Sequence, residues 1–238
     1  MGPALGTACA RRGDTGSGKS SVIRAFLAVW RWDTVLLDPK ALEFGAWPVG
    51  GRVMASTGHP GELTDTLRHW AVQVADRMRQ LATVGATHWA DPDAAGLALR
   101  PVLVVLDEAA VALSRPAPGE SQKETRERTD AARQSLLEVL VLGRACGVHV
   151  VVGLQRPDAA FLGGAARDQL RARIALGRLS PDGSRMVFDA DLSDQMTGEP
   201  GRGYAVGLGP DMPTPVRFRA AWITPADLRS LYASQVSS

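Results

Sequence analysis

This sequence has little lysine, little cysteine and no long apolar run. The two cysteines, Cys9 and Cys146, are too few for a disulfide framework, which indicates a reducing compartment. No apolar stretch approaches the length of a membrane span, and the N-terminus lacks the basic-then-apolar pattern of a signal peptide. We therefore expect a cytoplasmic protein that associates with a membrane only through a membrane-anchored partner or through an N-terminal membrane region missing here.

The charge balance is close to neutral. The chain has 27 lysines and arginines against 25 aspartates and glutamates, a net charge of +2, which neither requires nor excludes a nucleic-acid partner. The lysines are Lys19, Lys40 and Lys123, so arginine carries nearly all the positive charge. Arginine suits bidentate contacts to phosphate, although a GC-rich genome would produce the same bias. The four histidines have no metal-ligand spacing with the cysteines or with one another, so we expect ordinary surface or core residues.

Short apolar runs alternate with amphipathic stretches along most of the chain. At 238 residues, this alternation predicts one large α/β domain with a mostly parallel sheet and helices on both faces. Strands are expected over residues 34–38, 52–56, 101–107, 148–154, 174–176, 203–206 and 216–218. Helices are expected over residues 62–83, 124–146 and 225–232, near 168–170 and from 181 onward, with a loop over 115–123.

Residues 13–20, GDTGSGKS, match the phosphate-binding loop pattern. The glycines allow the backbone to turn tightly, so that its N–H groups point inward at an anion. Lys19 adds a positive charge for the β- and γ-phosphates, and the Ser20 hydroxyl is placed to hold Mg²⁺. A flexible Gly/Ser turn is the alternative, but the apolar helical stretch that follows supplies the helix N-terminus that the motif requires. The nucleotide-binding residues expected from this motif are Gly13, Asp14, Thr15, Gly16, Ser17, Gly18, Lys19, Ser20 and Ser21.

The residues before this loop form a poor strand. Residues 4–12, ALGTACARR, contain no valine or isoleucine and end in two arginines. Either the first strand is weak, or N-terminal sequence has been lost or mis-started, and we favour the second possibility. Residues 1–12 are therefore set apart as a poorly matched segment, and residues 13–238 as the domain.

Two further segments place polar side chains at the ends of apolar strands. The run 102–106 ends in Asp107, which would complete the Mg²⁺ shell with Ser20, and Glu108 is suited to polarise an attacking water. The alternative for Asp107 is an N-cap of the next helix. Gln155 closes another strand, where its amide would sense the γ-phosphate or orient the water. The alternative for Gln155 is that its amide satisfies local backbone groups.

Several blocks of the chain resemble, in order, those of the FtsK/SpoIIIE family of DNA-translocating ATPases. The resemblance covers about residues 13 to 220. It rests on TGSGKS at 15–20, LLDPK at 36–40, VLVVLDEAA at 102–110, GRACGVHVVVGLQRP at 143–157, RARIAL at 171–176 and SRMVFD at 184–189.

This resemblance implies a RecA-like P-loop NTPase core that assembles as a homo-hexameric ring around double-stranded DNA, with ATP and Mg²⁺ between subunits. Such a site needs an arginine from the neighbouring subunit. Arg173 is the first choice for this arginine, and Arg178 is the second. The family often has an arginine at the position of Gly177, and in this chain the arginine, Arg178, comes one place later. A surface salt bridge is the alternative for either arginine. The implied activity is ATP hydrolysis coupled to DNA movement, in chromosome partitioning or, as the short arginine-rich chain favours, in actinobacterial conjugative transfer.

The same motifs fit two alternatives to DNA transport. A protein-exporting ATPase of the type VII secretion kind has the same fold, and a truncated gene would give an inactive remnant. Asp38 and Lys40 would link the nucleotide site to the subunit interface, or would belong to a simple Asp-Pro turn. Arginines on two helices would contact DNA phosphates or lie on solvated helix faces. These arginines are Arg77, Arg79, Arg126, Arg128 and Arg133.

Overall fold

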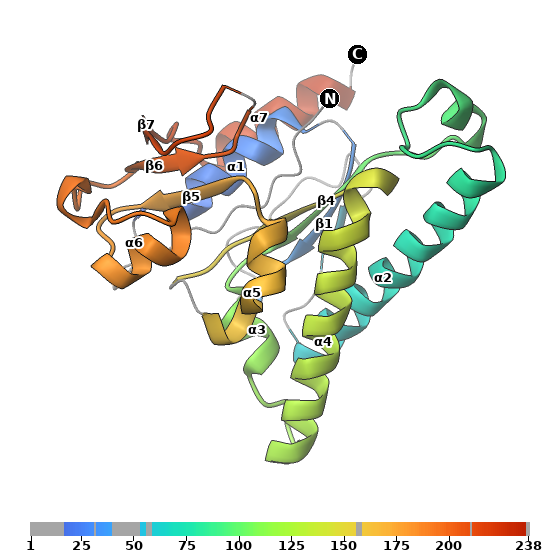
Figure 1. Ribbon diagram of the computed structural model, residues 1–238, viewed down its shortest axis with the longest axis horizontal. Coiled ribbons are helices and arrows are strands. Elements are labelled where there is room, and N and C mark those ends of the chain that lie inside the picture. The colour runs from blue at the N-terminus through green and yellow to red at the C-terminus, as the bar shows by residue number, and fades with distance from the viewer. Residues whose placement is uncertain are drawn as a thin grey trace.

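The structure, a computed structural model, describes residues 17–30, 32–39, 53–55, 59–155, 159–209 and 211–236 (Figure 1). The helices are α1 (Lys19–Val29), α2 (Pro60–Thr83), α3 (Ala109–Ser114), α4 (Gln122–Leu142), α5 (Ala159–Gln169), α6 (Pro181–Phe188) and α7 (Pro225–Val236). Short 3₁₀ turns lie at Pro92–Leu97, Gly143–Cys146 and Ser193–Gln195. The strands are β1 (Asp33–Leu37), β2 (Val53–Ala55), β3 (Val102–Leu106), β4 (Val148–Val152), β5 (Arg173–Leu176), β6 (Arg202–Val206) and β7 (Val216–Arg219).

The described strands form two sheets. Four of them make a parallel sheet in the order β2-β1-β3-β4, and the other three make an antiparallel sheet in the order β5-β6-β7. The expected parallel sheet is thus confirmed for the first four strands, whereas the last three pair as antiparallel neighbours. The connection from β5 to β6 contains α6, and residues 207–215 join β6 to β7. The N-terminal segment 1–12 lies outside the described residues.

Helices cover both faces of the parallel sheet, as the sequence predicts. Along β3, Val102, Val104 and Leu106 point into a core formed with α2 and α4, while Leu103 and Val105 pack with α1 and α7. Because successive side chains of a strand point to opposite faces, a strand covered on both sides is apolar throughout. Figure 1 shows α2 and α4 on one side of the strands and α1 and α7 on the other.

The antiparallel sheet packs against the first helix. Val22 of α1 contacts Ile174, Leu176 and Ala205 on one face of this sheet. On the opposite face, Tyr204 and its neighbours form a separate core with α6. The small sheet is therefore held beside the helix that follows the phosphate loop.

Local signals explain where the long helices begin. α2 starts with Pro60 in its first turn, and the His59 side chain accepts a hydrogen bond from Gly61 N. α4 starts with a capping box in which Ser121 and Glu124 satisfy each other's backbone N–H groups. These caps agree with helix boundaries within two residues of those that the sequence predicts.

Two helices differ from expectation. α3, with 6 residues, is too short to give a periodic signal, and the sequence did not predict it. α5 begins at Ala159, well before the expected helix near 168–170. Glycines at 163 and 164 weaken its intrinsic helix propensity, and packing against α4 overrides that preference. Among the described residues, no helix is long and apolar enough to cross a membrane.

Candidate active site

The last part of the phosphate loop leads directly into α1. Gly18 is the residue before the helix and has a φ of +97°, a conformation that glycine adopts without strain. Lys19, Ser20 and Ser21 form the first turn, whose N–H groups have no partner within the helix and are available to an anion. Gly13, Asp14, Thr15 and Gly16 lie outside the described residues.

Three strands of the parallel sheet end level with one another beside this loop. Register pairs Leu37 with Leu106, and Asp107 N donates to Leu37 O at 3.0 Å. Asp38 and Asp107 therefore follow neighbouring strand ends, and both are buried. On the other side of β3, Gly153 directly follows β4 and lies close to Asp107. A Cβ added to Gly153 would lie 2.5 Å from Asp107 Oδ1. The Asp107 carboxylate thus lies at the carboxyl edge of the sheet, in a space that has room for it only because residue 153 has no side chain.

Lys19 brings the two motifs together. Its Nζ lies 2.7 Å from Asp107 Oδ1 and 3.2 Å from Glu108 Oε1. Lys19 is far in sequence from the adjacent pair Asp107 and Glu108, and the two segments meet where the sequence motifs place the triphosphate and the metal ion. Only 13% of the Lys19 side chain and 2% of the Asp107 side chain are exposed, so water screens this contact weakly.

Glu108 has an unusual backbone conformation at the junction between β3 and α3. Its φ of +51° lies in the left-handed region, which costs a non-glycine residue about 1–3 kcal/mol and is found preferentially at functional sites. The carboxylates of Glu108 and Asp107 both contact the Lys19 ammonium. Gln155 Nε2 donates to Glu108 Oε1 at 2.6 Å, so the Gln155 amide contacts the site and not only local backbone.

The contacts of Asp107 also bear on its alternative role as a helix cap. Asp107 Oδ1 accepts a hydrogen bond from Glu108 N at 3.0 Å, a purely local contact. The N-cap residue of α3 is Glu108, and no side chain caps this helix. Asp107 is therefore positioned mainly by Lys19 and by Gly153.

Burial is the largest influence on the pKa values of the two central charges. It lowers the pKa of Lys19, but the Asp107 and Glu108 carboxylates outweigh it and raise that pKa above its ordinary value of 10.5. For Asp107, burial raises the pKa and the Lys19 ammonium opposes the rise. Lys19 is consequently protonated at neutral pH and available to bind phosphate oxygens.

The oxygen atoms available here suit Mg²⁺. Ser20 supplies a hydroxyl and Asp107 a buried carboxylate, the donors with which proteins hold Mg²⁺ together with substrate phosphates. Within the described ranges, no group of three or more histidine, cysteine, aspartate or glutamate side chains could hold a metal ion alone. A Mg²⁺ ion at this site would therefore take its remaining ligands from substrate phosphates and water.

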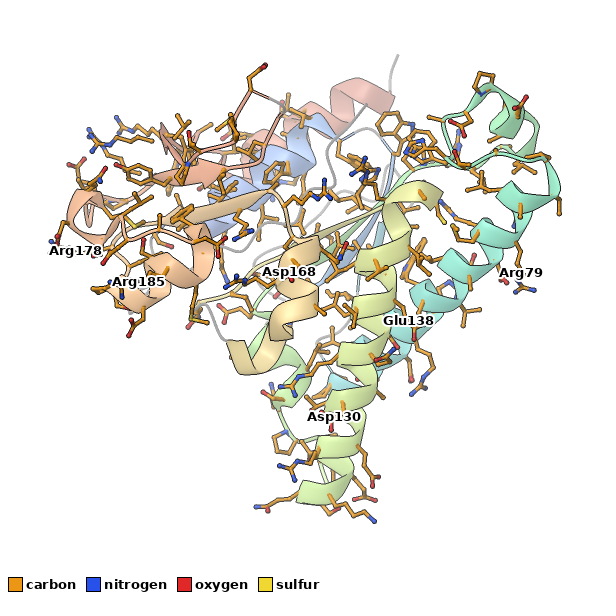
Figure 2. The ribbon with its side chains drawn as sticks, viewed as in Figure 1. Arg79, Asp130, Glu138, Asp168, Arg178 and Arg185 are labelled. Atoms are coloured by element: carbon orange, nitrogen blue, oxygen red, sulfur yellow. The ribbon has the colours of Figure 1, made fainter. Side chains whose placement is uncertain are left out.

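The two candidate arginines differ in their surroundings. Arg173 is 17% exposed and donates to Leu170 O at 3.0 Å, to Val187 O at 2.8 Å and to Asp189 Oδ2 at 2.8 Å. Arg178 is exposed and makes no ion pair within the part of the chain that the structure describes. Figure 2 shows Arg178 at the outer end of the molecule, on the side of α6 and the antiparallel sheet. Arg173 is thus held within its own chain, whereas Arg178 projects into solvent.

Most of the other arginines considered for DNA have partners within the chain. Arg77 donates to Arg100 O and Cys146 O, and Arg128 is tied to Glu120 and two backbone carbonyls. Arg79 pairs with Asp76 and projects from α2 far from Arg178 (Figure 2). Arg133 pairs with Asp130, whereas Arg126 is exposed. Lys40 lies outside the described residues.

Sequence reasoning missed Gly153 as part of this site. A glycine directly after a buried strand often marks a close approach of another group, and this signal was present in the sequence. What the sequence did not contain is the identity of that group, because strand order alone brings Gly153 beside Asp107.

Comparisons with known proteins agree with these motifs, although no family model matches the chain. The chain is 30% identical to the FtsK domain-containing protein YdcQ of Bacillus subtilis (strain 168) over 203 residues, which is 83% of this chain and 40% of that protein. It is 27% identical to the DNA translocase FtsK of Streptomyces coelicolor over an alignment of 243 residues, 92% of this chain and 25% of the translocase. The chain thus spans less than half the length of these relatives.

Solved structures of similar fold include two ATPases. The conjugation coupling protein TcpA, solved in a monomer form with ATPgS, has a TM-score of 0.78 and 21% identity, covering 98% of this chain and 65% of its own. The cytoplasmic domain of the type VII secretion ATPase EccC of Thermomonospora curvata has a TM-score of 0.71 and 23% identity, covering 96% and 28%. At this identity the neighbours show the fold alone, a RecA-like P-loop fold. Over most of its length, the chain is similar in sequence to DNA translocases of the FtsK/SpoIIIE family.

Proposed function

We propose that this chain is a motor domain that hydrolyses ATP and uses the energy to move double-stranded DNA. The observation that carries the proposal is the contact of Lys19 with Asp107 and Glu108 in a chain of this family. That contact brings a phosphate-binding cation, a metal-binding carboxylate and a catalytic carboxylate within reach of one triphosphate.

In the proposed mechanism, the N–H groups of the loop and the Lys19 ammonium bind the β- and γ-phosphates. Ser20 and Asp107 would hold Mg²⁺, which would neutralise charge that develops on the transferred phosphoryl group. Glu108 accepts a proton from the attacking water and orients it in line with the γ-phosphate. Its buried position beside Lys19 and Gln155 fixes the direction of its carboxylate.

Gln155 has a second role in this proposal. Its amide donates to the same Glu108 oxygen that Lys19 contacts. When a γ-phosphate draws Lys19 toward itself, Glu108 would keep Gln155 as a partner and remain oriented. Gln155 would therefore link the presence of the γ-phosphate to the position of the catalytic carboxylate.

Completion of the site would need a second subunit. We propose a homo-hexameric ring in which Arg178 of one subunit approaches the triphosphate of the next, with Arg173 as the weaker choice because it is held within its own subunit. An arginine in this position is worth about 10³–10⁵ in rate. DNA would be gripped through its phosphates, so binding should weaken steeply with salt.

The cellular process is a finer proposal. We propose conjugative DNA transfer ahead of chromosome partitioning, and the conjugation coupling protein TcpA, a neighbour in fold, is consistent with that choice. Association with a membrane through an anchored partner belongs to the same proposal. Protein export of the type VII kind is the second choice, since curated sequence relatives are named as DNA translocases and the secretion ATPase EccC enters as a fold neighbour.

The test is ATP turnover with and without linear duplex DNA. We expect DNA to increase turnover in the wild-type chain, Glu108→Gln to lower kcat by about 10²–10⁴-fold and Lys19→Ala to abolish nucleotide binding. Matched controls are Lys123→Ala and Glu127→Gln, a surface pair on α4 whose side chains are 85% and 65% exposed. Turnover that is indifferent to DNA and to both site variants would refute the motor function. Stimulation by a secreted peptide in place of DNA would favour the export function.

A further inference from the structure

A glycine from the C-terminal part of the chain touches the phosphate loop. Gly201 precedes β6, and its N–H donates to Ser17 O at 2.9 Å. The two backbones are so close that a Cβ on Gly18 would lie 3.1 Å from Gly201 Cα. The phosphate loop is thus supported from outside by a backbone segment that belongs to the antiparallel sheet.

Gly201 is itself held in place from the other side. Its carbonyl accepts a hydrogen bond from Ala220 N at 2.7 Å, just after β7. Its φ of +74° lies in the left-handed region, and this conformation directs the N–H toward Ser17 and the carbonyl toward Ala220. Glycine adopts that conformation readily, whereas most other residues are strained in it.

The same segment continues toward Arg178. Arg202, the residue after Gly201, accepts a hydrogen bond at its carbonyl from Gly177 N at 2.9 Å. Gly177 directly precedes Arg178 in the chain. Two hydrogen bonds and two short stretches of covalent backbone therefore connect Ser17 with the exposed arginine.

We propose that Gly201 is a positioning residue that holds the phosphate loop in its binding conformation and connects it to Arg178. This inference rests on the proposed function, in which the loop binds triphosphate and Arg178 serves the next subunit. Loop N–H groups bind phosphate well only when they are already aligned, so a fixed Ser17 carbonyl lowers the reorganisation that binding requires. Movement of the loop would reach Arg178 through Arg202 and Gly177.

The chain offers variants that separate this role from a general loss of stability. Among the described residues, a Cβ on Gly201 meets only Ala220 O, at 3.8 Å, so we expect Gly201→Ala to disturb backbone conformation more than packing. Gly85 has a φ of +70°, and no atom of the described residues lies within 4 Å of a Cβ on it; it follows α2, far in sequence from the phosphate loop. Gly85→Ala therefore imposes the same conformational strain elsewhere. Gly198→Ala adds a methyl group in open space three residues before Gly201.

The experiment measures the Kd of a fluorescent ATP analogue, kcat and KM for ATP, and the thermal midpoint for each variant. We expect Gly201→Ala to raise the Kd about tenfold, the effect of losing one well-placed hydrogen bond with its alignment. Gly201→Asn should bind more tightly than Gly201→Ala, because asparagine tolerates the left-handed region. Gly85→Ala should lower the thermal midpoint by a similar amount with a Kd within about twofold of wild type, and Gly198→Ala should change neither.

A second arm tests the connection to Arg178. In the Arg178→Ala background, Gly201→Ala should still raise the Kd but should lower kcat no further, because both changes then act on one step. If the double variant lowered kcat by the product of the two single effects, the connection between Gly201 and Arg178 would be overturned.

The positioning role would be overturned if Gly201→Ala bound nucleotide like wild type, or if Gly85→Ala weakened binding equally. If Gly201→Ala yields no folded protein, Gly201→Asn compared with Gly85→Asn carries the same comparison. The binding measurement does not depend on DNA. If the wild-type chain binds the analogue but shows no DNA-stimulated turnover, the proposed function is refuted. The Kd values of Gly201→Ala and Gly85→Ala can still be compared in that case.

Discussion

Gly153→Ala is expected to impair catalysis by displacing a single carboxylate. The added Cβ would lie 2.5 Å from Asp107 Oδ1 and 3.4 Å from Asp107 Cα. A carbon–oxygen contact relaxes to about 3.3 Å, so the carboxylate must move by about 1 Å. A misplacement of this size near reacting groups costs about 10²-fold in rate, and overpacking costs about 1–3 kcal/mol of stability.

The matched control is Gly143→Ala, at the C-terminal end of α4. A Cβ there would lie 2.8 Å from Val148 O, so this variant is overpacked as well but leaves Asp107 untouched. We expect both variants to lose stability, and only Gly153→Ala to lose kcat per folded molecule and affinity for Mg²⁺–ATP. Turnover, the Mg²⁺ concentration at half-maximal rate and chemical unfolding would be measured together. Equal turnover in the two variants would refute the assignment of Asp107 to the site.

Three further predictions concern other parts of the molecule. Arg178→Ala should lower kcat about 10³-fold with an unchanged thermal midpoint, whereas Arg173→Ala should lower the thermal midpoint; the reverse pattern would restore Arg173 as the arginine supplied to the neighbour. Hydrogen bonds from Arg128 are the main cause that lowers the pKa of Glu120 from 4.5 to about 2, so this pair stabilises the fold above pH 4.5 and loses its effect as the pH falls toward 2. Arg128→Met should therefore lower the thermal midpoint at pH 7 and approach wild type near pH 2; a difference that does not change with pH would contradict this. Burial lowers the pKa of His149 below 6.5, so the neutral imidazole stabilises the fold fully above that pH and this stabilisation is lost on acidification. His149→Phe should therefore reduce the fall in the free energy of unfolding between pH 7 and 5, measured by denaturant titration. An unchanged dependence of that free energy on pH would contradict this prediction.

Much of the local architecture follows from sequence because its causes are local. The apolar run at 102–106 forms β3 and ends in Asp107 as expected, since a strand buried on both faces must be apolar throughout. Ser121 and Glu124 determine where α4 begins because they satisfy backbone groups within one turn. The phosphate-loop motif is also local, and α1 follows it directly.

The sequence also indicated which side chains would meet. Asp107 and Gln155 each follow a parallel strand, and the carboxyl ends of parallel strands share one edge of a sheet. Their convergence with Lys19 and Glu108 was therefore predictable from strand endings without knowledge of any distance. The distances of 2.7 Å and 2.6 Å that connect them come from the structure.

Tertiary structure decided the features that depend on contacts between distant segments. The sequence ranked Arg173 ahead of Arg178, but in the structure Asp189 and two backbone carbonyls hold Arg173, whereas Arg178 is exposed. Gly201 carries no sequence signal for a role at the phosphate loop, because only the docking of the antiparallel sheet on α1 brings it to Ser17. Local patterns determine strands, helices and caps, whereas long-range packing determines which backbone contacts the phosphate loop and which arginine remains exposed.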